Sequence, residues 1–154
     1  MSRSVPTDIT PHEGMFRDRL HYFACRVYYE DTDFSGIVYH ANYLKFFERA
    51  RSDMLDQLGM DQRAAFEANE GAYAVVDMHI KYIAPAKFQD DLLVITFATK
   101  LRRASVELTQ LIMRGDEKIA SATVQAAFLT PAGRPRRQPE AWTDAFAAVI
   151  MDDG

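Results

Sequence analysis

The sequence predicts an α+β fold, with one long helix packed against an antiparallel sheet. Three observations lead to this prediction: a strand-like stretch over residues 22–29, a helical pattern over residues 41–58, and a second half that changes to successive strand-like stretches. A run of strands after a single long helix is typical of α+β proteins. In such a layout the helix covers one face of the sheet and the other face looks outward.

The N-terminal end is expected to be a flexible arm. Residues 1–20 are mostly polar and are interrupted by Pro6, Pro11 and Gly14, and these residue types break regular structure. Residues 22–29 are rich in aromatic and β-branched side chains, which favour a strand. We therefore expect the folded domain to begin near residue 21.

The pattern over residues 41–58 predicts the long helix. Its apolar side chains recur at steps of three and four residues, as they do along one face of a helix. They are Leu44, Phe47, Met54 and Leu58, with Ala50 or Arg51 between them. Gly59 is a suitable C-terminal stop. Residues 61–70 predict a short second helix that ends at Gly71.

The second half of the chain predicts four further strands and a terminal helix. The expected ranges are 73–82, 92–99, 106–113 and 119–129 for the strands and 140–151 for the helix. The first of these strands alternates apolar and polar residues, as a half-buried strand does. The second is apolar on both faces, which suggests that another copy of the chain buries its outer face or edge. The sheet domain would then span residues 21–139, followed by a C-terminal helix and tail over residues 140–154.

The composition is that of one soluble globular domain. A chain of 154 residues with 48% hydrophobic and 26% charged residues can bury a core but is too short for two ordinary domains. The net charge of -4 gives no reason to expect nucleic-acid binding. Cys25 is the only cysteine, so no intrachain disulfide can form. No apolar run approaches the ~18 residues of a membrane span, and we expect a cytoplasmic protein without a transmembrane segment.

Residues 26–43 are the most informative part of the chain. They predict a strand, then an acidic turn, then the start of the long helix. This order places the carboxylate of Asp33 near a helix N-terminus, where free backbone N–H groups can hold developing negative charge. An acid beside such donors can attack a carbonyl group. On its own, an aspartate here is more typical of a turn or a helix cap than of a catalytic site.

The same segment carries a family resemblance. The runs Tyr29-Glu-Asp-Thr-Asp33, Gly36-Ile-Val-Tyr-His-Ala-Asn-Tyr43 and Phe47-Glu-Arg-Ala-Arg51 resemble the signature of the 4-hydroxybenzoyl-CoA thioesterase family of hotdog-fold enzymes. Within that family they look most like the Tol-Pal-associated acyl-CoA thioesterases. The resemblance implies a hotdog fold, in which the sheet wraps around the long helix and two copies join their sheets into a homodimer, or assemble further into a homotetramer.

The resemblance also implies an activity, the hydrolysis of an acyl-CoA thioester to a free carboxylic acid and CoA. It implies no cofactor and no metal, since CoA is part of the substrate and product. Acyl-carrier protein is an alternative carrier of the acyl group. Two other functions stay open: a non-catalytic module that binds acyl-CoA or acyl-carrier protein, and a dehydratase or hydratase of 3-hydroxyacyl thioesters.

Site residues follow from the resemblance, position by position. Asp33, rather than Asp31, corresponds to the nucleophile or general base, and the backbone N–H of His40 corresponds to the oxyanion donor. The candidate substrate-binding residues are Gly36, Ile37, Val38, Tyr39, Asn42, Tyr43 and Glu48. Asn42 and Tyr43 are as well explained as helix-start residues, and Glu48 as an ion-pair partner of Arg49 or Arg51 or part of a solvated face.

Two basic segments are candidates for binding the phosphates of CoA. They are Lys100, Arg102 and Arg103 at one predicted turn, and Arg134, Arg136 and Arg137 after the last strand. Guanidinium and ammonium groups are the usual phosphate ligands, although basic turns are common in any soluble protein. The chain has no glycine-rich phosphate loop and no zinc motif, so neither a nucleoside triphosphatase nor a zinc enzyme is supported.

Overall fold

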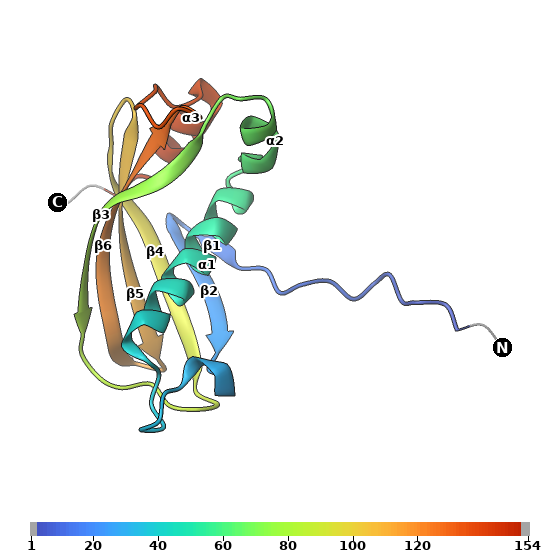
Figure 1. Ribbon diagram of the computed structural model, residues 1–154, viewed down its shortest axis with the longest axis vertical. Coiled ribbons are helices and arrows are strands. Elements are labelled where there is room, and N and C mark those ends of the chain that lie inside the picture. The colour runs from blue at the N-terminus through green and yellow to red at the C-terminus, as the bar shows by residue number, and fades with distance from the viewer. Residues whose placement is uncertain (1–2, 152–154) are drawn as a thin grey trace.

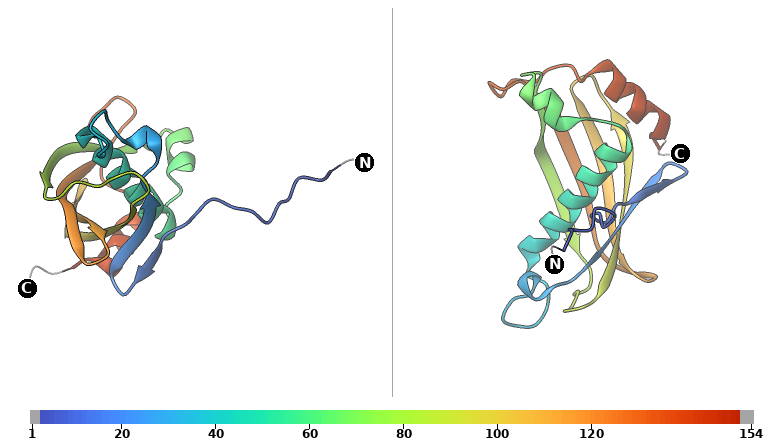
Figure 2. Two further views of the ribbon diagram at one scale, coloured as in Figure 1. Left: turned by 90° about the horizontal axis from the view of Figure 1, so that it is seen from below. Right: turned by 90° about the vertical axis from the view of Figure 1, so that its right-hand side faces the viewer.

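The computed structural model describes residues 3–151 and has the predicted α+β fold. A six-stranded antiparallel sheet with the order β1-β2-β4-β5-β6-β3 packs against the long helix α1, and the sheet curls around this helix (Figure 1, Figure 2). The strands are β1 Met15–Arg17, β2 Leu20–Arg26, β3 Ala72–Tyr82, β4 Asp91–Leu101, β5 Ser105–Arg114 and β6 Glu117–Leu129. The helices are α1 Tyr43–Gln57, α2 Gln62–Glu67 and α3 Glu140–Val149, and two short 3-10 turns are η1 Tyr29–Asp31 and η2 His40–Asn42.

Helix α1 supplies the centre of the core. Phe46 and Phe47 are fully buried, and Ala50 and Met54 continue the same face. Full burial of one phenylalanine side chain contributes about 1.5–3 kcal/mol, so these side chains hold the helix against the sheet. The predicted face was wrong at one position. Leu44 is 42% exposed, because the buried face runs through Phe46 and leaves position 44 on the outside of the helix.

Helix α3 closes one end of the sheet. Its Trp142 and Phe146 pack with Phe128 of β6 and with the half-buried Tyr73 of β3. The hydroxyl of Tyr73 also donates a hydrogen bond to the buried side chain of Gln138, just before α3. This second apolar cluster fixes the C-terminal helix, whose start agrees with the predicted position.

The N-terminal part of the structure differs from the sequence prediction. We expected no structure before residue 21, yet β1 pairs with β2 in a short hairpin. Aromatic residues do continue to Tyr29, but the strand ends at Arg26 because the chain turns there into η1. The fully buried His21 of β2 contacts Asp53 of α1 at 2.6 Å, a long-range contact that gives no local signal in the sequence.

The two ends of the sheet carry different segments. At one end lie the connection from β2 to α1, the connection from β3 to β4, and the turn between β5 and β6 (lower end of Figure 1). At the other end lie the turn between β4 and β5 and the chain after β6. No helix among residues 3–151 has the length and apolar character needed to cross a membrane.

Candidate active site

Asp33 lies at the tip of a small loop. Thr32 and Val38 pair across its base, the N–H of Asp33 donates to the carbonyl of Ile37 at 2.9 Å, and the N–H of Gly36 donates to the carbonyl of Asp33 at 3.0 Å. Gly36 has φ +83° with open space around it, so the turn geometry itself requires glycine. The sequence prediction of an acidic turn is therefore confirmed, with its acid exposed at the surface.

The loop keeps the Asp33 carboxylate ionised. The hydroxyl and the backbone N–H of Ser35 both donate to Oδ1 of Asp33. These hydrogen bonds, with a smaller contribution from the charge of His40, lower the pKa of Asp33, because hydrogen bonds to a carboxylate favour its charged form. An exposed, ionised carboxylate can act as a nucleophile or as a general base at neutral pH.

Asp31, two residues earlier, has a different role. Its side chain is only 4% exposed, and its Oδ2 accepts a hydrogen bond from the backbone N–H of Tyr28 at 2.8 Å. Its carbonyl oxygen accepts hydrogen bonds from the N–H of Tyr39 and from the side-chain amide of Asn42. Asp31 thus holds the loop together, and Asp33 is the acid of the pair that faces solvent.

His40 is the first residue of η2, directly before α1. Within residues 3–151, its backbone N–H makes no hydrogen bond, whereas its carbonyl oxygen accepts one from the hydroxyl of Tyr82 at 2.9 Å. The imidazole ring lies 4.7 Å from the ring of Tyr39 and 6.2 Å from that of Tyr82, between centroids. The N–H of His40 shares its peptide group with the carbonyl of Tyr39, which accepts a hydrogen bond from the N–H of Asn42 at 2.8 Å. A free N–H at a helix start, in a peptide group held in this way, is suited to an oxyanion.

A cavity of about 260 Å³ has His40 in its wall. It is lined by Ile37, Val38, His40, Tyr43, Tyr82, Ile83, Ala84 and Pro85. Tyr43 also has a structural role, since its hydroxyl accepts a hydrogen bond from the N–H of Ala86 at 3.1 Å. Three candidates from the sequence, Ile37, Val38 and Tyr43, therefore lie together beside His40, whereas Asn42 braces the loop through Asp31.

Glu48 lies on α1, one and a half turns after its first residue. It makes no ion pair with Arg49 or Arg51 within the described residues. Instead it borders a second cavity, of about 280 Å³, at the far half of α1. The half-buried Arg51 of this cavity donates to the side chain of Gln110 at 3.0 Å. The other residues of its wall include Met54, Leu55, Tyr73, Val106, Leu108 and Phe146.

The two basic segments lie next to each other but far from Asp33. Gln138 connects them through hydrogen bonds to the carbonyls of Arg102 and Arg103, and Arg136 donates to the carbonyl of Glu70 at 2.7 Å. Both segments are at the end of the sheet opposite the Asp33 loop (Figure 1). The intervening strand β4, Asp91–Leu101, spans about 33 Å at the usual rise per residue. The structure therefore brings the two basic segments together, but within a single chain they do not reach Asp33.

Some site residues had no signal in the sequence. Tyr82 reaches His40 across 42 positions, and Ala86 joins the site through its backbone. Only the folded sheet brings the end of β3 against the start of α1. Cys25 packs, partly buried, against the main apolar core, and this burial raises the pKa of its thiol to about 11. No group of three metal-ligating side chains occurs among residues 3–151.

Known proteins similar to this chain establish its family. Residues 35–121 match the model of the thioesterase superfamily. The chain belongs to the thioesterase superfamily. The acyl-CoA thioesterase YbgC of Haemophilus influenzae is 42% identical over 105 residues, which cover 68% of this chain and 77% of that protein. The acyl-CoA thioester hydrolase YbgC of Escherichia coli O157:H7 is 39% identical over 123 residues, 79% of this chain and 91% of that protein.

A solved structure of a related protein has the same fold as this thioesterase superfamily member. The crystal structure of a probable thioesterase from Bartonella henselae matches with a TM-score of 0.74 and 37% sequence identity, over 78% of this chain and 99% of that one. The family and the hotdog fold predicted from residues 29–51 are therefore confirmed.

Proposed function

We propose that this thioesterase superfamily member is an acyl-CoA thioesterase that hydrolyses its substrate to a free carboxylic acid and CoA. One observation carries the proposal: the ionised, exposed Asp33 shares a loop and helix start with His40, whose N–H is free. The names of the two curated relatives given above support the same reaction.

The reaction needs only these two groups and water. The Asp33 carboxylate attacks the thioester carbon, or removes a proton from the water that does so. The carbonyl oxygen becomes negative and accepts a hydrogen bond from the N–H of His40. The C–S bond then breaks and the CoA sulfur takes up a proton. In the general-base route this proton returns from Asp33, and the acyl carbon keeps the hydroxyl oxygen of water. In the nucleophilic route the acyl group is left on Asp33 as a mixed anhydride, which a water molecule then hydrolyses to the free acid and the regenerated carboxylate. The proposal includes no metal and no further cofactor.

The edge of the sheet supports a homodimer. β3 is an edge strand of eleven residues, and Val75, Val76 and Tyr82 on it are 47%, 53% and 50% exposed. A long apolar edge invites pairing with another strand. In a two-fold dimer the same patch meets itself, so β3 of one copy runs antiparallel to β3 of the other. A homotetramer would need a further surface.

This pairing completes the site. Antiparallel pairing sets the end of β3, where Tyr82 holds His40, beside the start of β3 in the second copy. The start of β3 carries Tyr73 and Val75, which line the cavity of about 280 Å³. It also adjoins Glu70, which Arg136 holds. The Asp33 loop of one copy would thus face this cavity of about 280 Å³, which would hold the acyl group, and the basic segments of the other copy.

The remaining parts of the proposal rest on the family resemblance alone. They are a cytoplasmic location and an association with the Tol-Pal envelope machinery. The choice of CoA rather than acyl-carrier protein as the carrier has the further support of the names of the two relatives.

Thiol release from a panel of acyl-CoAs tests the proposal. The panel contains short aliphatic, long aliphatic and aromatic acyl groups, with 3-hydroxyacyl-CoA and crotonyl-CoA assayed for water addition or loss. Turnover of one class to free CoA is the expected result. Tight binding without turnover of any CoA or carrier-protein thioester would indicate a binding module, and interconversion of crotonyl- and 3-hydroxyacyl-CoA would indicate a hydratase.

A further inference from the structure

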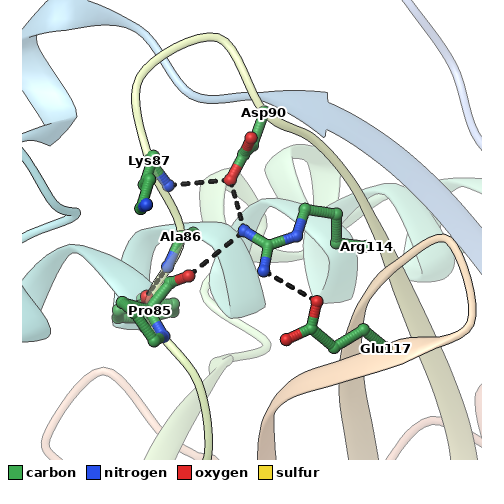
Figure 3. A network of polar contacts seen from close by, with 7 residues as sticks. Pro85, Ala86, Lys87, Asp90, Arg114 and Glu117 are labelled. Carbon is green, nitrogen blue, oxygen red and sulfur yellow. Dashed lines mark hydrogen bonds and ion pairs between the residues drawn. The ribbon is translucent and has the colours of Figure 1, made fainter.

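Arg114, the last residue of β5, holds the connection between β3 and β4 (Figure 3). Its Nη1 donates to Oδ2 of Asp90 at 2.6 Å and to the carbonyl of Pro85 at 3.1 Å. Its Nη2 donates to Oε2 of Glu117, the first residue of β6, at 2.8 Å. One guanidinium group therefore joins both ends of the connection to the sheet.

The connection held by Arg114 is also the support of the active-site loop. The N–H of Val38 donates to the carbonyl of Ala86 at 2.8 Å, and Ile37 pairs with Lys87. The fully buried Ala86 also donates from its N–H to the hydroxyl of Tyr43. Residues 37, 38 and 43 flank His40 on both sides, so the position of the His40 N–H depends on this connection.

The ion pair between Arg114 and Asp90 is the less exposed of the two ion pairs that Arg114 makes within residues 3–151. The side chains of Arg114 and Asp90 are 29% and 24% exposed, whereas that of Glu117 is 51% exposed. Burial opposes ionisation of Asp90, but the N–H of Lys87 and the guanidinium of Arg114 outweigh it and lower the pKa of Asp90. Asp90 is thus ionised at neutral pH and receives both donors on one oxygen.

We propose that Arg114 is a positioning residue of the thioesterase site. By binding both Pro85 and Asp90, it fixes the connection to which the Val38 N–H is hydrogen-bonded, and through Val38 it sets the His40 N–H at the oxyanion. This inference rests on the proposed function for its effect on catalysis, but the effect on the backbone does not depend on it. Arginine suits the role because its planar guanidinium presents five donors in a fixed arrangement, whereas a lysine ammonium offers three donors at the end of a flexible chain.

The test compares Arg114→Ala with Glu117→Ala. Both remove a charge of the same cluster, but only the first releases Pro85 and Asp90. Thermal melts first establish that each variant is folded at the assay temperature. We expect Arg114→Ala to lower kcat about tenfold, with KM within about twofold, since the oxyanion contact forms only in the transition state. Guanidinium ion at millimolar concentration, or the variant Arg114→Lys, should restore part of kcat, and Glu117→Ala should stay near wild type.

Amide hydrogen exchange gives a readout that needs no turnover. Faster exchange of the Val38 N–H in Arg114→Ala, and not in Glu117→Ala, is the expected result. Unchanged exchange at Val38, or equal kcat values in the two variants, would overturn the positioning role. If the wild-type protein hydrolyses no thioester, the proposed function fails, and the exchange of Val38 alone decides whether Arg114 holds the loop.

Discussion

The hydroxyl of Tyr82 donates a hydrogen bond of 2.9 Å to the carbonyl oxygen of His40. This bond joins the last residue of the edge strand β3 to the first residue of η2. The carbonyl of His40 is fixed by protein, and its N–H is free for a substrate oxygen. The same contact places the oxyanion donor directly at the strand through which we propose that two copies pair.

Removal of that hydroxyl should weaken catalysis without unfolding the protein. Tyr82 is 50% exposed, so Tyr82→Phe leaves no buried polar group unpaired. A hydrogen bond of this kind contributes about 0.5–1.5 kcal/mol, and we expect kcat to fall by up to about tenfold with an unchanged melting temperature. Steady-state kinetics and a thermal melt measure both. A loss of melting temperature with a wild-type kcat would show that the contact serves only the fold.

The acidic limb of the pH–rate profile should depend on Ser35. Its two hydrogen bonds favour the charged carboxylate and lower the pKa of Asp33 below the ordinary 3.8. Activity that needs the carboxylate is lost as pH falls through that pKa. Ser35→Ala removes the hydrogen bond from the Ser35 hydroxyl to Asp33. The pKa of Asp33 should therefore rise, and the loss of kcat/KM should begin at a higher pH. Coincident profiles of wild type and variant would exclude Asp33 as the titrating group.

A mixed dimer tests whether the site is shared between two copies. Asp33→Asn removes the acid, and Glu48→Arg fills the cavity beside Arg51 with a second cation. If the acid of one copy serves the cavity of the other, a mixed dimer of the two variants has one intact site. Refolding the inactive variants together should then restore about a quarter of wild-type activity, since half of randomly paired dimers are mixed.

The control for this experiment is each variant refolded alone, which should stay inactive. If Asp33 and Glu48 of the same copy formed a site, each site of a mixed dimer would carry one of the two substitutions, and no activity would return. That result would place Asp33 and Glu48 in the same site of the same copy.

Folding stability should fall on mild acidification because of His21. Burial lowers the pKa of His21 below its ordinary 6.5 and outweighs the opposing effect of Asp53; within the described residues, Nδ1 has no hydrogen-bond partner that a proton there could use. Below pH 6.5 the unfolded chain therefore binds more protons than the folded one, and stability rises as pH rises through this range. The free energy of unfolding by urea should be lower at pH 5.5 than at pH 7.5.

The variant His21→Phe identifies the source of this pH dependence. It should flatten the difference between the two pH values, whereas His12→Gln, at an exposed histidine, should keep it. An unchanged pH dependence in His21→Phe would assign the effect to other groups.

Local patterns were enough to predict most of the fold. The alternation over residues 73–82 and the apolar steps of α1 correspond to elements within a few residues of their observed bounds. The β1–β2 hairpin was missed because its support is His21 against Asp53, a contact between residues far apart in sequence. The exposure of Leu44 was missed because three- and four-residue steps fit two neighbouring faces, and only the position of the sheet decides between them.

In the candidate site, too, local features were predictable from the sequence and long-range contacts were not. Asp33, Gly36 and His40 lie in one contiguous segment, and there the turn and the helix start follow from residue types. Tyr82, Ala86 and Arg114 join the site through contacts between strands and loops, which no spacing in the sequence encodes. The basic segments were predicted as two separate candidates for binding CoA phosphates. That they lie together, and at the end of the sheet opposite Asp33, follows from the strand order and from the direction of β4, which the sequence does not state.

The most direct measurement is the rate of CoA release by wild type, Asp33→Asn and Glu30→Gln, side by side with the best acyl-CoA of the panel. Glu30 is the matched control, because it is an exposed carboxylate of the same acidic run. If Asp33 carries the chemistry, Asp33→Asn should lower kcat by at least about a hundredfold at an unchanged melting temperature, with Glu30→Gln near wild type. A near-normal kcat in Asp33→Asn would contradict the central role of Asp33.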